Sequence, residues 1–143
     1  MYSALSVARY IIMYCNKYGK TISNLKLQKI LYFVQAEFLV SKGYPCFSER
    51  IEAWDFGPVV PDVYYNYRVY GAASIPSSKD SKYCPFDKED KEIADSIIEE
   101  CSSYSASDLV EITHNQTPWK NAYRQSKSGL ISNDSIKAFF EER

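Results

Sequence analysis

The sequence is poor in the residues on which most catalytic and metal sites depend. It contains one histidine, His114, and four cysteines, Cys15, Cys46, Cys84 and Cys101, none of which belongs to a CxxC pair. A structural zinc site needs four such ligands at close spacings, so the sequence predicts no metal site. A single histidine without an evident partner is weak evidence for a catalytic base. We therefore predict a protein that is not an enzyme and needs no cofactor.

Glycine and net charge are also low. The five glycines are scattered, and the chain has neither a phosphate-binding loop nor a GxGxxG or GxSxG motif. The net charge of −1 disfavours nucleic acid and anionic membranes as partners. The N-terminus lacks the basic region and the purely apolar run of a secretory signal. These absences predict a cytoplasmic protein with free thiols.

Tyrosine, in contrast, is abundant. The chain carries 13 tyrosines among 143 residues, and 45% of all its residues are hydrophobic. That hydrophobic content is typical of a folded protein, and the length favours a single domain over residues 1–143. Because tyrosine combines apolar area with a polar tip, it is enriched at protein interfaces. Some of these side chains are therefore expected in contact sites.

The most regular pattern lies in residues 23–41, SNLKLQKILYFVQAEFLVS. Apolar residues recur there at steps of three and four, and others occupy the remaining sides, so the pattern predicts a helix with neighbours nearly all round. Ser23 is a suitable N-cap, and Gly43 and Pro45 follow the expected end. The segment is too short and too charged to span a bilayer. We expect it to be the central helix of the fold.

The rest of the chain predicts a mainly α fold with a minor β element. Apolar periodicity and capping signals favour six or seven helices arranged around the central one. The predicted helices span residues 3–18, 23–41, 61–70, 87–102, 105–114, 118–126 and 134–142. Thr117 is expected to cap the sixth of them, with Pro118 at its first position.

The β element is expected after the central helix. Residues 47–52 favour an extended segment, and residues 55–58, DFGP, favour a tight turn. Short strands near Ile75 and over residues 82–84 would then form a hairpin with residues 48–54.

Aromatic residues and prolines gather around the predicted turn. They are Trp54, Phe56, Pro58, Pro61, Tyr64 and Tyr65. Two interpretations remain open. Trp54 and Tyr64 fill the core while the prolines shape the turn, or the whole corner is a binding surface. In the second case the prolines pre-order the backbone, which lowers the entropy cost of binding, and the rings supply contact area.

Two polar features favour structural roles. His114 is expected at a helix end, with its imidazole bonded to the backbone or a neighbour and Trp119 docked into the core. Gln28, Tyr32 and Gln35 recur at helical spacing on the central helix. That spacing favours a satisfied internal network over an active site.

Three segments resemble a known family. They are LKLQKILYFVQAEFL at residues 25–39, IEAWDFGPVVPDVYYNYRVYG at residues 51–71 and VEITHNQTPWKNAY at residues 110–123. The chain resembles the Panacea domain, also called the SocA-like or phage-associated GepA-like antitoxin domain. The EAWxxGPVxPxxY element is specific for this family, and Ile112 stands where the family has leucine.

The resemblance implies a compact, mostly helical, non-enzymatic domain that binds and neutralises a cognate toxin protein. It also implies an alternative, a proteolytic adaptor that delivers its toxin to an AAA+ protease. Many such domains are encoded in prophages or other mobile elements. Some relatives carry added DNA-binding segments for which this chain has no room, so regulation by direct DNA binding is disfavoured.

The family motif positions present in this chain are Lys29, Tyr32, Trp54, Gly57, Pro58, Val59, Pro61, Tyr64, His114, Pro118 and Trp119. We predict that the partner-binding surface lies near residues 54–70 and is completed from the third segment. Its expected residues are Trp54, Phe56, Pro58, Val59, Pro61, Tyr64, Tyr65, Arg68, His114 and Trp119.

Overall fold

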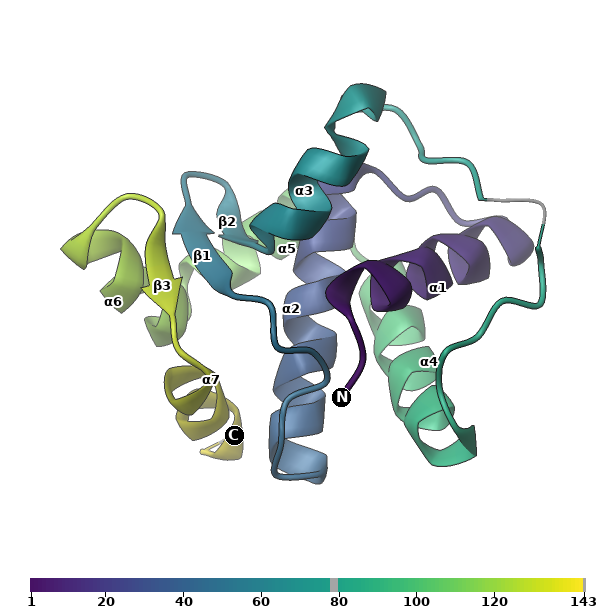
Figure 1. Cartoon of the computed structure of the whole chain (residues 1–143). Coiled ribbons are helices and arrows are strands. Elements are labelled where there is room, and N and C mark those ends of the chain that lie inside the picture. Colours follow the sequence, from purple (N-terminus) through teal and green to yellow (C-terminus); the bar gives the residue numbers. More distant parts are fainter. Residues whose placement is uncertain (78–79, 143) are drawn as a thin grey trace.

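Helices dominate the computed structural model, which describes residues 1–77 and 80–142 (Figure 1). The α-helices are α1 (Ala4–Lys17), α2 (Asn24–Ser41), α3 (Pro61–Tyr67), α4 (Lys88–Ser102), α5 (Ala106–His114), α6 (Thr117–Gln125) and α7 (Asn133–Glu141). One 3-10 turn, Arg68–Tyr70, follows α3. The strands are β1 (Ile51–Trp54), β2 (Gly57–Val59) and β3 (Gly129–Ile131). The prediction of a mainly α fold with a minor sheet is confirmed.

Helix α2 runs down the middle of the molecule and contacts α1, α3, α4, α5, α7 and β2 (Figure 1). The Ser23 side chain caps it by accepting a hydrogen bond from the Lys26 N–H. Helix α2 is buried on several sides, because Leu27, Leu31 and Phe38 lie on one face, Tyr32 and Ala36 lie on others, and all five are buried. Burying one such side chain stabilises the fold by about 1.5–3 kcal/mol, so α2 organises much of the core. The predicted central helix is confirmed.

Helix caps agree with the sequence at most places. A reciprocal capping box joins Ser105 and Asp108 at the start of α5. At α6 the predicted cap is wrong by one residue, because Thr117 is already helical and Gln116 occupies the cap position. The Gln116 side chain does not cap the helix. It accepts a hydrogen bond from the Tyr32 hydroxyl at 2.7 Å and so ties α6 to α2.

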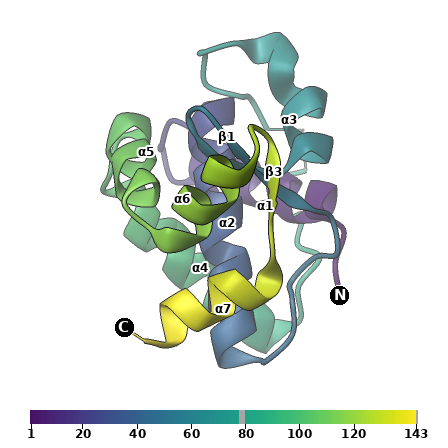
Figure 2. The same ribbon diagram turned by 90° about the vertical axis from the view of Figure 1, so that its left-hand side faces the viewer.

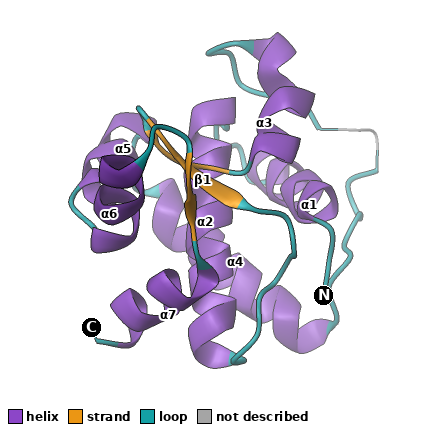
Figure 3. Ribbon diagram, turned by 60° about the vertical axis from the view of Figure 1, so that its left-hand side comes forward, coloured by secondary structure: helices purple, strands orange, loops and turns teal. Residues whose placement is uncertain are grey.

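The three strands form one antiparallel sheet in the order β2-β1-β3. Ala53 in β1 pairs with Pro58 on one side and with Gly129 on the other. The sheet lies between α6 and α3 (Figure 3). This arrangement brings the β1–β2 turn, the start of α3 and the connection between α5 and α6 to the same end of the molecule.

The β prediction was correct in kind and wrong in its boundaries. The strand covers residues 51–54 rather than 47–52. The predicted turn at residues 55–58 is shorter, because Gly57 and Pro58 already belong to β2. The backbone therefore reverses over two residues, and the glycine and proline pair with β1.

The strands predicted near Ile75 and over residues 82–84 are wrong. Ile75 is buried, but its N–H donates to the carbonyl of Ile22 at 2.8 Å and its own carbonyl accepts from Asn16 at 3.0 Å. These bonds hold the loop against the α1–α2 link. The third strand comes instead from β3, far along the chain.

Tyrosines of the N-terminal segment connect α1 to α4. The Tyr2, Tyr10 and Tyr14 hydroxyls donate to the Asp90, Asp95 and Glu99 carboxylates, respectively. Burial, reinforced by these bonds, raises the pKa of all three tyrosines. We call this row the tyrosine ladder. Part of the tyrosine excess is therefore used inside the fold and not at a partner surface.

Candidate functional site

Four aromatic side chains meet where β1 turns into β2 and α3 begins. They are Trp54, Phe56, Tyr64 and Tyr65, which we call the aromatic corner. The Trp54 ring lies 4.9 Å from Tyr64 and 5.9 Å from Phe56, and the Tyr64 and Tyr65 rings are 5.6 Å apart, measured between ring centroids. Three of the rings are half-buried, and Tyr65 is 57% exposed. The corner is thus a packed surface cluster and not part of the closed core.

The outer edge of the aromatic corner carries a positive charge. The Arg68 guanidinium lies 5.4 Å from the centroid of the Tyr65 ring, within the range of a cation–π contact. Val69 beside it is 85% exposed. Tyrosine and arginine are the residue types most often found at binding hot spots. This edge therefore offers aromatic, apolar and cationic contacts together.

A second aromatic group supports the corner from α5 and α6. The His114 and Trp119 rings stack with centroids 4.1 Å apart, and Trp119 stacks on Tyr123 at 4.6 Å. The Trp119 indole N–H donates to the carbonyl of Trp54 at 2.8 Å, and the Tyr123 hydroxyl donates to Asp55. The structure therefore brings His114 and Trp119 against the back of the β1–β2 turn.

The environment of His114 differs in part from the expectation. His114 does end α5, and Trp119 packs against the core. However, the buried Nε2 atom of His114 has no hydrogen-bond partner within the described ranges. The imidazole is held by stacking on Trp119, at an angle of 29° between the rings.

Beneath the turn lies a buried lysine. Lys29 of α2 is fully buried, and its ammonium donates to the carbonyl of Pro58 at 2.7 Å. Burial lowers its pKa from 10.5 to about 7. Gly57 passes directly over it with φ of +109°, and a Cβ at Gly57 would lie 2.7 Å from the Lys29 Cε atom. Lys29, Gly57 and Pro58 therefore fix the turn from below.

Several predicted site residues have internal positions. Pro58 and Val59 are buried in β2, so their side chains do not reach the surface in this structure. Pro118 is buried at the start of α6, and Tyr32 is buried on α2. Pro61 occupies the first turn of α3 and is half-buried. These residues shape the site from the inside, while the side chains of the aromatic corner form its surface.

The polar residues of α2 form the satisfied network that their spacing predicts. The Gln28 side chain accepts from the Val60 N–H at 2.9 Å. The Gln35 side chain accepts from the N–H groups of Cys46 at 2.8 Å and Phe47 at 3.1 Å. Both glutamines bond to backbone that leads into or out of the sheet. They hold the backbone on either side of the β1–β2 hairpin.

Sequence reasoning missed Tyr123 and Asp55. Tyr123 lies four residues after Trp119, a spacing that places two side chains on one helix face. That spacing was the available signal for the stack. The bond from Tyr123 to Asp55 joins residues 68 positions apart, and nothing local in the sequence indicates it.

The part of the chain that the structure describes offers neither a metal-binding cluster nor a membrane-spanning helix. Among residues 1–77 and 80–142, no group of three or more His, Cys, Asp or Glu side chains could hold a metal ion. None of the helices in that part of the chain is both long enough and apolar enough to cross a membrane. Burial raises the pKa of the Cys15 thiol to about 11 and that of Cys101 to about 12, which disfavours the reactive thiolate.

A known protein family matches the part of the chain that carries the aromatic corner and its supporting residues. The family described as "Antitoxin SocA-like, Panacea domain" matches residues 27–120, which run from α2 into α6. The chain belongs to the SocA-like Panacea family. The Panacea match contains all four residues of the aromatic corner, together with Lys29 and the His114–Trp119 pair. The family resemblance noted in the sequence is therefore confirmed.

One curated relative of this Panacea protein is Antitoxin SocA of Caulobacter vibrioides (strain NA1000 / CB15N). It is 37% identical over 109 residues, an alignment that covers 68% of this chain and 58% of the relative. The chain thus spans less than two thirds of the length of that relative. No solved structure gives a significant match to this Panacea protein.

Proposed function

We propose that this chain is an antitoxin that binds a cognate toxin protein in the cytoplasm through the aromatic corner. Membership of the Panacea family, with a relative named as an antitoxin, carries the proposal. The corner adds a physical reason, because it combines half-exposed aromatic rings with the Arg68 guanidinium at its edge. Binding there neutralises the toxin by covering its working surface or by holding it in an inactive form.

The corner is suited to binding because its backbone is held on two sides. Lys29 bonds the Pro58 carbonyl from below, and Trp119 bonds the Trp54 carbonyl from behind. A surface that is already ordered loses little entropy when a partner binds. More of the contact energy is then available as affinity.

The first experiment is growth of cells that express the reading frame beside this gene, with and without this protein. We expect the neighbouring product to arrest growth alone and growth to resume when both are present. A purified complex of the two proteins would then identify the partner. A harmless neighbour, or arrest that this protein does not relieve, contradicts the proposal.

The adaptor alternative is separated in the same strain. An antitoxin that only occupies the toxin leaves the toxin's half-life unchanged or longer. An adaptor shortens that half-life, and the effect disappears when the AAA+ protease is deleted. Immunoblotting of the toxin after synthesis is stopped distinguishes the two.

We also infer that the role requires no catalysis. His114 is held by stacking on Trp119, and burial raises the pKa of the Cys15 and Cys101 thiols, which supports this inference. His114→Ala is expected to weaken toxin binding and growth rescue together, since it loosens the support of the corner. Loss of rescue with full toxin binding would indicate an enzyme instead.

A further inference from the structure

An apolar groove lies between α2, α4, α5 and α7. It is open to solvent and has a volume of about 400 Å³. Phe33 of α2 and Phe140 of α7 pack edge to face in its lining, with ring centroids 6.0 Å apart. Ile97 of α4 and Ile112 of α5 line it as well, and both are half-buried. Apolar side chains from four helices thus surround one hollow that nothing in the described chain fills.

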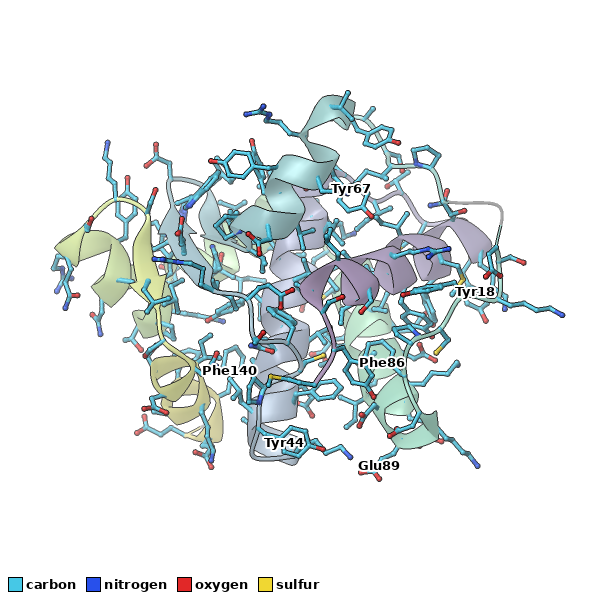
Figure 4. The ribbon with its side chains drawn as sticks, in the orientation of Figure 1. Tyr18, Tyr44, Tyr67, Phe86, Glu89 and Phe140 are labelled. Atoms are coloured by element: carbon cyan, nitrogen blue, oxygen red, sulfur yellow. The ribbon has the colours of Figure 1, made fainter. Side chains whose placement is uncertain are left out.

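The groove is separate from the aromatic corner. None of its lining residues belongs to the corner or to the His114–Trp119–Tyr123 stack. In Figure 2, α4 lies between α5 above and α7 below, and all three helices pack against α2. Phe140 is at the lower left in Figure 4, whereas Tyr67, at the end of α3, is near the top. A ligand in the groove therefore leaves the corner free.

The chemistry of the lining favours a helix as the occupant. An extended peptide brings unpaired backbone N–H and C=O groups, each of which needs a partner when it is buried. All but one of its described lining residues lie in helices, and the exception, Tyr104 in the α4–α5 turn, donates its N–H to the Cys101 carbonyl at 3.1 Å. The described lining therefore offers no strand edge to pair with. A helix satisfies its backbone internally and needs only a place for its apolar face.

The charge of the rim indicates which helix would fit. Among the residues that the structure describes, the charged ones lining the groove are Glu37 of α2 and Glu100 of α4, and none is a lysine or arginine. Glu37 accepts from the Ser41 hydroxyl at 3.0 Å, and Glu100 is exposed. Two carboxylates beside an apolar hollow attract basic groups and repel acidic ones, which selects between partners.

We propose that this groove binds an amphipathic helix of a partner protein, with large apolar residues at i, i+4 and i+7 on one face and lysine or arginine beside them. The apolar residues enter the hollow between Phe33, Ile97, Ile112 and Phe140. The basic residues pair with Glu37 and Glu100. This inference goes beyond the antitoxin proposal, because it uses none of the residues of the aromatic corner.

The probe is a fluorescein-labelled, stapled helical peptide with leucines at i, i+4 and i+7 and lysines flanking them. The control peptide has glutamates in place of those lysines. Fluorescence anisotropy with the full chain is expected to give saturable binding of the lysine peptide and at least about tenfold weaker binding of the glutamate peptide.

Variants on the rim locate the binding site. Glu100→Lys is expected to weaken binding of the lysine peptide about tenfold and to strengthen binding of the glutamate peptide, because the sign of the charge on the rim is reversed. Glu92→Lys is the matched control, since Glu92 is also exposed on α4 but does not line the groove. Tyr104→Ala removes a lining side chain that is 42% exposed and should weaken both peptides. Thermal melts verify that each variant is folded.

Three results would overturn the proposal. The first is no saturable binding of the lysine peptide, and the second is equal binding of both peptides by the wild type and by Glu100→Lys. The third is a dimer in sedimentation that Glu100→Lys dissociates, because a second copy of the chain would then fill the groove. Tyr65→Ala should bind the lysine peptide as tightly as the wild type does. Peptide binding therefore tests the groove independently of the antitoxin proposal, which places toxin binding at the aromatic corner.

Discussion

At the scale of single residues, Lys29 has the most unusual environment. It is fully buried, and its pKa is lowered to about 7 by burial. Between pH 7 and its ordinary pKa of 10.5, the unfolded chain keeps the Lys29 proton and the folded chain releases it. Stability rises with pH wherever the unfolded state binds more protons, so Lys29 makes the free energy of unfolding increase across this range.

Lys29→Met should remove that increase. Methionine has similar length and no charge, although it leaves the Pro58 carbonyl without its donor. Each unit of pKa depression is worth about 1.4 kcal/mol. The free energy of unfolding of the wild type should therefore rise by a few kcal/mol over this pH range, and that of the variant by much less. Urea unfolding at a series of pH values measures this. Lys120→Met, at an exposed position, is the control and should keep the wild-type slope.

Gly57 is a second residue whose environment dictates its identity. Its φ of +109° disfavours any side chain, and an added Cβ would lie 2.7 Å from Lys29 Cε and 3.0 Å from Thr113 Oγ1. Gly57→Ala should therefore destabilise the fold by about 2 kcal/mol or more. Gly43→Ala is the control, because Gly43 also has a positive φ of +80° but nothing within 4 Å of its added Cβ. Equal losses in the two variants, measured by denaturant unfolding, would contradict the close approach of Lys29.

Tyr65 tests the aromatic corner directly. At 57% exposure it contributes little to the core, so Tyr65→Ala should leave the melting temperature nearly unchanged. If the corner binds the toxin, affinity should fall by about 2 kcal/mol or more, the loss typical of a hot-spot aromatic. Tyr44→Ala is the matched control, since Tyr44 is 50% exposed and lies at the other end of the molecule (Figure 4). Titration calorimetry with the purified toxin compares the three proteins, and equal affinities would remove the corner from the interface.

At the scale of elements, the tyrosine ladder makes the α1–α4 contact sensitive to alkali. The pKa of each ladder tyrosine is raised in the folded chain, so the folded state keeps the protons that the unfolded state releases above a pH of about 10. The stabilisation is complete below that pH and is lost as the pH rises further. Stability should therefore fall above about pH 10.

Tyr10→Phe and Tyr14→Phe should make this fall smaller, because phenylalanine cannot ionise. At neutral pH each variant loses one hydrogen bond to a carboxylate, which costs about 1.5–3 kcal/mol. Tyr18→Phe, at a 55% exposed position outside the ladder, is expected to change neither property. Circular dichroism during alkaline titration measures the effect, and an unaltered alkaline transition in the double variant would exclude the ladder as its cause.

The elements also show what local sequence can predict. Helices were predicted well, because their caps and their periodicity involve residues within a few positions of each other. The sheet was not predicted well, because the pairing of Ala53 with Gly129 joins segments far apart in the sequence and depends on how the helices pack. Ile75 shows the same limit, since burial alone does not distinguish a strand residue from a loop anchored to α1 and α2. The corner could be proposed from its composition, but its support by Tyr123 and Asp55 depends on the fold.

At the scale of the whole molecule, α2 couples the site to the core. It contacts α1, α3, α4, α5, α7 and β2, it carries Lys29 beneath the corner, and it supplies Phe33 to the groove. A chain of this length with one such core is expected to unfold in a single cooperative step. The corner should then persist only as long as the helices do.

Leu31→Ala tests this coupling. Leu31 is fully buried on α2, and removing such a side chain costs about 2–5 kcal/mol. Trp54 belongs to the corner and Trp119 donates to the Trp54 carbonyl, so the fluorescence of both tryptophans reports on the site, while far-UV circular dichroism reports on the helices. In the wild type the two signals should give one denaturant midpoint, and Leu31→Ala should lower both midpoints equally. A fluorescence transition that precedes the loss of helix would show that the corner unfolds by itself, and its binding surface would then have to be ordered by the partner.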